Sequence, residues 1–160
     1  MESKSLSFIS YNSTGLDVEK INWINGLLDS TNVVCFQLQE HFKATKSVNQ
    51  FFKKHFGNFD PFVVPAIRDN CSHAGRPKGG LAQLVRKNIA VRKENIPSNS
   101  WRIQAQILHF DYYKILWFNV YMPTDPQLQQ IDETVIHEVL GEIDHIMSAS
   151  VFNDVILGGD

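Results

Sequence analysis

The sequence lacks any apolar run long enough to cross a bilayer. A spanning helix needs about 20 consecutive apolar residues, and polar residues interrupt every apolar run well before that length. The first residues, MESKSLSFIS, contain no apolar core of the kind found in a signal peptide. With 43% hydrophobic and 20% charged residues, the composition is typical of a globular domain. We therefore expect no membrane partner and an intracellular location.

Cysteine is also scarce, and the two cysteines are too few for a disulfide framework. Cys35 lies in the apolar run VVCFQLQ, which predicts a buried free thiol. Cys71 and His73 are followed by no second ligand pair, which argues against a zinc site. His137 opens a pattern similar to the metalloprotease helix, but Gly141 stands where the second histidine ligand is required. No G-x-S-x-G nucleophile elbow is present.

Basic residues are absent from the last part of the chain. Residues 115–160 carry eight Asp or Glu and no Lys or Arg, whereas residues 43–114 carry 13 Lys or Arg and four acids. The net charge of −2 therefore hides a basic middle segment. Such a segment suits a polyanionic partner such as nucleic acid. An ordinary solvated surface explains it equally well.

Hydrophobic periodicity predicts an α/β domain. The opening pattern is strand, helix, strand, which predicts a parallel pair of strands, and five strand-like segments fill the middle of the chain. The alternation of polar and apolar residues over 102–107 is typical of a half-buried antiparallel strand. Helices that cover sheet faces follow from this order. The expected helices span 17–28, 46–55 and 128–148. Before and after the five middle segments, strands are expected over 6–11, 33–38 and 154–157.

Four apolar runs each end at or near one polar residue. SFISYN ends at Asn12, VVCFQLQE ends at Glu40, ILWFNVYMP contains Tyr121, and DVILGGD ends at Asp160. Side chains at the carboxyl ends of strands converge on the ligand crevice of α/β folds, and a carboxylate there suits Mg²⁺. Taken singly, each residue has an ordinary explanation: a turn asparagine, a salt-bridged edge glutamate, an interface tyrosine and an aspartate without intrinsic meaning. The functional interpretation depends on their coincidence.

The segment Gly75–Gly80 resembles a phosphate-binding loop only superficially. It leads into a strand and not into the N-terminus of a helix, so a turn that carries the two cations Arg76 and Lys78 is the better interpretation. Together with Arg86 and Lys87, these cations favour nucleic acid over a small phosphate ester as the partner.

In chain order, SYNSTGLD, FQLQEHF, GRPKGGLAQLVRKN, NVYMPTD and VILGGD resemble the endonuclease/exonuclease/phosphatase superfamily. The strongest resemblance is to the apurinic-endonuclease-like domain of non-LTR retrotransposons, the long interspersed elements. It implies a four-layered α/β sandwich, truncated before its C-terminal strands, in which residues 1–160 form one domain incomplete at the C-terminus. It also implies Mg²⁺-dependent phosphodiester hydrolysis, with Mn²⁺ as an alternative ion, DNA as the partner and a nuclear location.

The resemblance implies a role for each strand-end residue. Glu40 is similar to the metal-binding glutamate, and Asn12 to the asparagine that helps to order the metal site. Tyr121 matches a tyrosine that contacts the scissile phosphate or supports the leaving group. Asp160 matches an aspartate that orients or activates the attacking water. Thr14 stands where repair enzymes of the superfamily often carry a second metal-binding aspartate, which leaves the metal to Glu40 and water.

The sequence ends at Asp160, before the asparagine, aspartate and histidine that complete the phosphate grip in this superfamily. We therefore expect a DNA endonuclease of a retrotransposon, with the 160-residue chain itself an inactive fragment. The alternatives are a non-catalytic remnant that binds nucleic acid or protein, and a superfamily phosphatase.

Overall fold

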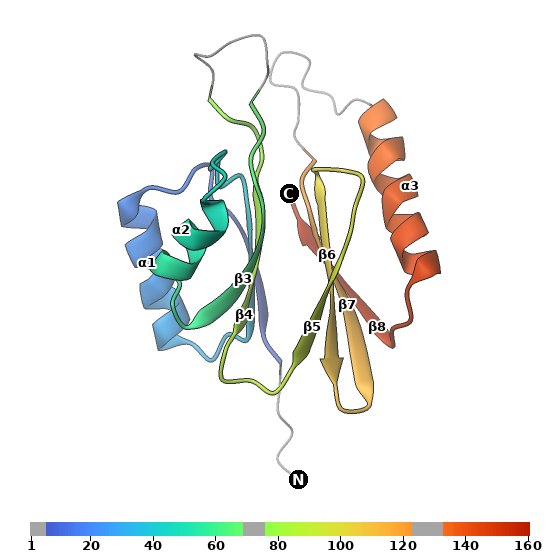
Figure 1. The fold of residues 1–160 in the computed structure, drawn as a ribbon, viewed down its shortest axis with the longest axis horizontal. Coiled ribbons are helices and arrows are strands. Elements are labelled where there is room, and N and C mark those ends of the chain that lie inside the picture. The colour runs from blue at the N-terminus through green and yellow to red at the C-terminus, as the bar shows by residue number, and fades with distance from the viewer. Residues whose placement is uncertain (1–5, 69–75, 123–132) are drawn as a thin grey trace. The chain divides into compact units, whose positions relative to one another are not determined.

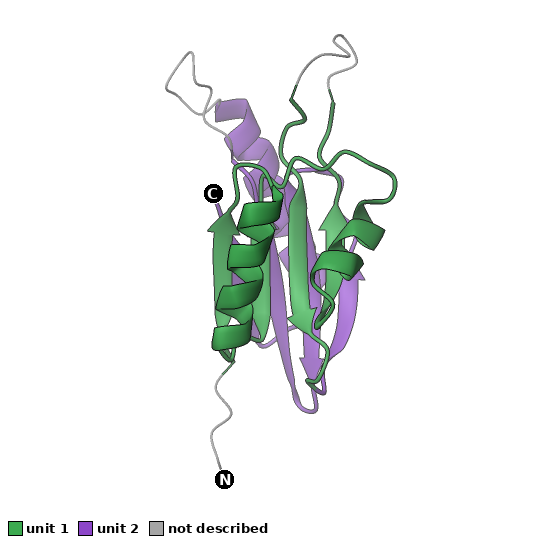
Figure 2. Cartoon of the chain, turned by 90° about the vertical axis from the view of Figure 1, so that its left-hand side faces the viewer, with its two compact units in different colours: residues 1–89 green, residues 90–160 purple. Residues whose placement is uncertain are grey.

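The structure is a computed structural model that describes residues 6–68, 76–122 and 133–160. The chain divides into two compact units, residues 1–89 and 90–160 (Figure 2). Among the described residues, no helix is long and apolar enough to span a membrane. In chain order the elements are β1 Phe8–Asn12, α1 Val18–Ser30, β2 Cys35–Gln39, α2 Val48–His55, β3 Phe59–Val64, β4 Leu81–Arg86, β5 Arg92–Ile96, β6 Ile103–Phe110, β7 Tyr113–Val120, α3 Glu133–Ala149 and β8 Asp154–Gly159.

The first unit contains a four-stranded sheet in the order β1-β2-β4-β3. The helix α1 joins β1 to β2, and the two strands pair in parallel, as the strand–helix–strand pattern predicts. The strand β4 is antiparallel to both β2 and β3. The helices α1 and α2 cover the same face of this sheet (Figure 1). The elements predicted over 6–11, 17–28, 33–38 and 46–55 are confirmed, with their ends displaced by at most two residues.

Helix α1 forms where the sequence predicts it. The Asp17 carboxylate accepts a hydrogen bond from the Lys20 N–H at 2.8 Å, which satisfies one of the first-turn donors that has no partner within the helix. Ile21, Ile24 and Leu28 recur at intervals of three and four residues and are buried in the core. The cap fixes where the helix begins, and the apolar stripe fixes which face meets the sheet.

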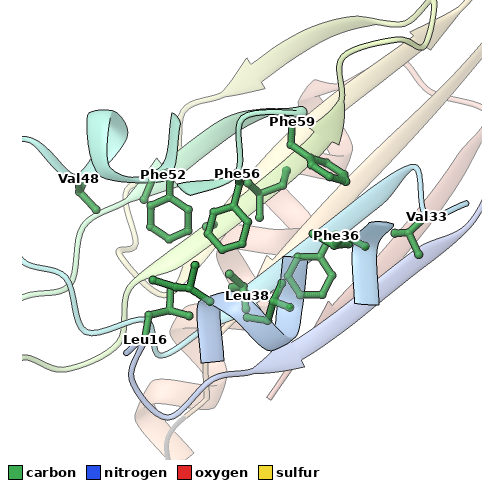
Figure 3. Packing of buried hydrophobic residues seen from close by; sticks show 14 residues of the cluster. Leu16, Val33, Phe36, Leu38, Val48, Phe52, Phe56 and Phe59 are labelled. Atoms are coloured by element: carbon green, nitrogen blue, oxygen red, sulfur yellow. The ribbon is translucent and has the colours of Figure 1, made fainter. Parts of the chain in front are cut away.

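The core of the first unit combines aliphatic side chains with four phenylalanines. Phe36 and Leu38 of β2 face Phe52 of α2 and Phe56, the residue that follows this helix (Figure 3), and all four are at most 1% exposed. Full burial of each such side chain contributes about 1.5–3 kcal/mol. Val48 and Phe52 of α2 are buried, whereas Phe51 of the same helix is only half-buried.

The second unit contains a four-stranded sheet in the order β5-β6-β7-β8. The strands β6 and β7 form an antiparallel hairpin through residues 111–112, and β8 joins β7 in parallel. The helix α3 packs on this sheet through Val139 and Ile146. His137 and His145 on the same helix are exposed.

Some predictions concern residues that the structure does not describe. Residues 128–132, the first part of the helix predicted over 128–148, lie outside the described residues, as do Cys71 and His73. Gly75, the first residue of the predicted turn, also lies outside them.

Strand β6 differs from its prediction, because residues 103–108 are all buried. Gln104 and Gln106 were expected on a solvent-facing side, but they are 1% and 3% exposed. Gln104 Oε1 accepts a hydrogen bond from Asn119 Nδ2 at 3.2 Å, and Gln106 Nε2 donates to Asn95 Oδ1 at 2.6 Å. The alternation of polar and apolar residues therefore predicts which face of the strand carries polar side chains, and not whether that face is exposed to solvent. Hydrogen bonds between side-chain amides of neighbouring strands take the place of contacts with water.

Cys35 provides a test of the first core. The thiol is buried and free, as predicted, and burial raises its pKa to about 12. Because only the thiolate reacts, we expect iodoacetamide at about pH 8.5 to label Cys35 only as fast as the protein unfolds. The free energy of unfolding should also fall as the pH rises above about 9, because the thiol ionises first in the unfolded chain.

Mass spectrometry of a Cys71→Ser protein would measure labelling of Cys35 alone. The same protein in guanidinium is the control for intrinsic reactivity. Equal labelling rates in native and denatured protein would contradict the burial of this thiol.

Candidate functional site

Two polar residues stand at the ends of adjacent parallel strands in the first unit. Asn12, the last residue of β1, pairs in register with Gln39, the last residue of β2, and Glu40 follows directly. The carboxyl ends of parallel neighbours lie at the same edge of a sheet. The structure thus brings Asn12 and Glu40 to one edge, where both are partly exposed.

Hydrogen bonds join the loops that follow these two strands. The Ser13 N–H donates to the Gln39 carbonyl at 3.0 Å, and the Gly15 N–H donates to the Glu40 carbonyl at 2.7 Å. Lys20 of α1 adds its Nζ, which donates to the carbonyls of Ser13 and Gly15 at 2.8 and 3.1 Å. The backbone around Glu40 is therefore held by the neighbouring loop.

Asn12 orders the turn after β1. Its Oδ1 accepts hydrogen bonds from the N–H of Thr14 at 2.9 Å and from the Thr14 hydroxyl at 3.2 Å, the arrangement of an Asx turn. Thr14 adopts a left-handed backbone conformation with φ of 44°. Because Thr14 has no carboxylate, the acidic group at this edge comes from Glu40.

Arg76 contacts the same loops. Its Nη2 donates to the Thr14 carbonyl at 2.8 Å, and its guanidinium lies 3.9 Å from the centre of the Phe42 ring. Stacking and hydrogen bonding together hold an exposed cation in one orientation. Lys78 is exposed as well, and its backbone pairs with Ile67 in an isolated bridge. Of the two predicted cations, Arg76 is the one whose contacts with these loops are defined.

Arg86 and Lys87 have structural roles that the sequence did not indicate. Arg86 Nη2 donates to the Leu28 carbonyl at the end of α1 at 2.7 Å, and its Nε donates to the Val33 carbonyl at 2.8 Å. Lys87 Nζ donates to the Gly57 carbonyl at 2.7 Å. These cations satisfy backbone carbonyls of the first unit.

His41 follows Glu40 but is not suited to acid–base chemistry. Its ring is buried, and desolvation lowers the pKa of His41 to about 4 against the opposing effect of the Val64 carbonyl. Nε2 lies 3.1 Å from that carbonyl, and Nδ1 lies 3.0 Å from the Lys43 N–H. The ring is therefore neutral near pH 7 and has no face open to a substrate.

In the second unit, Tyr121 and Asp160 follow another pair of parallel strands, β7 and β8. The Asp160 N–H donates to the Val120 carbonyl at 3.1 Å, and the Met122 N–H donates to the Asp160 carbonyl at 2.7 Å. Tyr121 is 5% exposed, whereas Asp160 is exposed. The structure thus places these two residues at one edge of the second sheet.

Tyr121 lies beside an arginine that the sequence analysis did not identify. The Arg102 guanidinium lies 4.2 Å from the Trp101 ring centre and 5.8 Å from that of Tyr121. Burial lowers the pKa of Arg102, while Tyr121 and Glu138 raise it. Its Nη1 is buried and has no hydrogen-bond partner within the described residues. Only the pairing of β6 with β7 reveals this neighbour, because Arg102 and Tyr121 are 19 positions apart in the sequence.

The donor set at Glu40 fits a hydrated hard cation. Mg²⁺ takes one or two carboxylates and keeps several waters, and the Glu40 carboxylate has no ion pair with another described residue. No cluster of three or more His, Cys, Asp or Glu side chains able to hold a metal occurs among the described residues. A single carboxylate such as that of Glu40 is compatible with a cation that keeps most of its water ligands.

No family model matches the sequence, and no curated protein matches it. Solved structures do match. D. rerio TDP2, in a complex with single-strand DNA product, is 20% identical; the match covers 99% of this chain and 61% of that chain with a TM-score of 0.61. AP endonuclease LMAP from Leishmania major is 15% identical, with 89% and 46% covered and a TM-score of 0.60. The endonuclease domain of TRAS1, a telomere-specific non-LTR retrotransposon, is 13% identical, with 96% and 57% covered and a TM-score of 0.53.

These proteins share the endonuclease/exonuclease/phosphatase fold. The chain has this fold, with two four-stranded sheets and helices packed on them, so the fold predicted from the order of the motifs is confirmed. At identities of 13–20% the likeness concerns the fold alone. The chain spans about half to three fifths of the length of these solved structures.

Gly159 provides a test of the geometry around Asp160. A Cβ at this position would lie 2.2 Å from the Val120 carbonyl oxygen, so alanine must displace the end of β8. We expect Gly159→Ala to lower the exchange protection of the Met122 amide by about ten-fold, the equivalent of one hydrogen bond. Hydrogen exchange followed by NMR measures this directly.

The control is Gly141→Ala in α3, where an added Cβ meets no atom within 4 Å. Alanine should stabilise that helix by up to about 1 kcal/mol and leave the Met122 amide unchanged. Wild-type protection of Met122 in Gly159→Ala would show that β8 does not approach β7 this closely.

Proposed function

We propose that the site in this chain serves the metal-dependent hydrolysis of phosphodiester bonds in DNA, as in an endonuclease of the retrotransposon type, and that residues 1–160 by themselves do not cleave DNA. The observation that carries the proposal is the edge at which Asn12, Glu40 and Arg76 meet. There, one pair of hydrogen-bonded loops holds a carboxylate suited to a hard cation and a guanidinium suited to a phosphate. A complex of D. rerio TDP2 with DNA and the TRAS1 endonuclease domain, both of this fold, support DNA as the substrate class.

In this proposal, Glu40 binds Mg²⁺ together with water, and Mn²⁺ can replace it. A bound metal ion supplies positive charge that stabilises the charge developing on the phosphate oxygens. Asn12 keeps the turn after β1 in the shape that the Asx turn defines. Arg76 binds a phosphate oxygen of the DNA backbone through its planar fork.

The roles in the second unit follow the resemblance. Tyr121 contacts the scissile phosphate or supports the leaving group, and Asp160 orients or activates the attacking water. Arg102 adds a guanidinium beside Tyr121 whose buried Nη1 suits an anionic partner. Lys78 contributes to the electrostatic attraction of DNA.

A second candidate is binding of nucleic acid without cleavage. Two observations favour it: Thr14 takes the place of a second acidic ligand, and the described residues contain no larger cluster of metal ligands. The two candidates differ in their dependence on Glu40, because a binding protein needs the cations but not the carboxylate.

Replacement of Glu40 tests the catalytic proposal. Glu40→Gln keeps the size of the side chain and removes its charge, so we expect Mn²⁺ affinity to fall by about ten-fold or more. Titration with Mn²⁺ followed by calorimetry measures the change. Glu19→Gln, an exposed glutamate of the same unit, is the control and should bind as wild type does. Equal Mn²⁺ affinity in Glu40→Gln and wild type would remove Glu40 from the metal site.

Arg76 tests the contact with DNA. Each phosphate contact changes the slope of log K against log salt by about 0.7–0.9, so Arg76→Ala should reduce the slope by about that amount and weaken binding to all sequences alike. Fluorescence anisotropy over a salt series measures the slope. Lys54→Ala, an exposed cation at the end of α2, is the control and should leave the slope unchanged. A slope that is flat in wild type would mean that the basic middle segment is only a solvated surface.

A further inference from the structure

His41 connects the loop that carries Glu40 to other parts of the first unit. Its backbone N–H donates to the Gly80 carbonyl at 3.4 Å. Its ring lies 3.1 Å from the Val64 carbonyl through Nε2 and 3.0 Å from the Lys43 N–H through Nδ1. Because a backbone N–H can only donate, Nδ1 accepts, and Nε2 of the neutral ring carries the proton that it donates to Val64.

Gly80 encloses the same ring. A Cβ at Gly80 would lie 2.5–2.8 Å from three atoms of the His41 ring, and its φ of 93° is one that favours glycine. On another side, the Phe52 ring of α2 lies 5.2 Å away in an edge contact. The imidazole is therefore fixed by backbone and aromatic neighbours, and it is 0% exposed.

The backbone on either side of His41 is unusual. Glu40 and Phe42 have φ values of 55° and 54°, in the left-handed region that non-glycine residues seldom adopt. Such conformations persist when surrounding contacts hold them. His41 stands between Glu40 and Phe42 in the sequence. Its contacts are therefore placed to hold the left-handed backbone of both neighbours.

We propose that His41 is a positioning residue for Glu40: its ring, held by Val64, Lys43 and Gly80, fixes the left-handed backbone that directs the Glu40 carboxylate to the strand edge. This inference rests on the proposed function for the role of Glu40 as a metal ligand. His41 itself contacts neither metal nor DNA. Its hydrogen bonds, and not its bulk alone, keep the carboxylate in place.

Two substitutions separate hydrogen bonding from bulk. His41→Phe keeps a ring without ring hydrogen bonds, whereas His41→Asn keeps an acceptor for the Lys43 N–H. We expect His41→Phe to weaken Mn²⁺ binding by about ten-fold or more, as loss of a supporting contact does at metal sites, and His41→Asn to bind much closer to wild type. Wild-type Mn²⁺ affinity in His41→Phe would overturn the proposal.

Gly80→Ala disturbs the position of the His41 ring without changing His41 itself. This second variant can be measured even if His41→Phe does not fold. It should weaken Mn²⁺ binding by about ten-fold. Its control is Gly57→Ala, where an added Cβ meets no atom within 4 Å, and which should bind as wild type does. Unchanged Mn²⁺ affinity in Gly80→Ala would also overturn the proposal.

Hydrogen exchange separates this inference from the proposed function. The amides of Ser13 and Gly15 donate to the carbonyls of Gln39 and Glu40, so their protection reports the loop geometry without any metal. In His41→Phe, we expect their protection to fall by about ten-fold, while amides of β7 in the second unit keep theirs. Suppose that Glu40→Gln binds Mn²⁺ normally and that the Ser13 and Gly15 amides lose protection in His41→Phe. The proposed metal site then fails and the positioning role of His41 stands. If Glu40→Gln loses Mn²⁺ binding but the Ser13 and Gly15 amides keep their protection in His41→Phe, the positioning role of His41 fails.

Discussion

The hydrogen bonds between the loop after β1 and the loop after β2 determine the geometry of the first edge. Ser13 and Gly15 donate to carbonyls at and beyond the end of β2, so each loop satisfies backbone groups that would otherwise need water. This mutual pairing requires parallel neighbours, because only then do two strands end side by side. With the backbone groups paired within the loops, the side chains of Asn12 and Glu40 are left to act at the surface. A change that separated the loops would move both side chains at once.

The second unit uses the same arrangement. The strands β7 and β8 are parallel and α3 lies between them in sequence, as α1 lies between β1 and β2. A parallel pair needs such a crossover, and the crossover helix supplies an apolar face that packs on the sheet. Each polar edge is therefore supported by a buried core. Gly159 is the specific requirement of the second edge, since backbone approaches backbone there too closely for a Cβ.

Local patterns in the sequence were sufficient to predict the helices and strands, but not several of the side-chain contacts. The position of α1 and the parallel pairing of β1 with β2 depend on neighbouring residues and on the order of elements along the chain, so hydrophobic periodicity and element order predicted them. Arg102 and the buried amides of β6 depend on register between strands, and register is set by pairing across the chain. His41 is similar: its tautomer and its enclosure by Gly80 arise from loops that meet only in the folded protein.

The number of charges in a segment likewise does not predict which of its cations are available for binding. The basic middle segment predicts a polyanion site by count alone, yet the structure divides its cations by what their N–H groups bind. Arg86 and Lys87 donate to backbone carbonyls, which ties their charge to the stability of the first unit. Arg76 also donates to a backbone carbonyl, that of Thr14, but its guanidinium lies on the Phe42 ring and the residue is exposed at the edge that carries Glu40. Because a phosphate selects donors that are both oriented and accessible, the position of one stacked arginine says more about binding than the net charge of the whole segment.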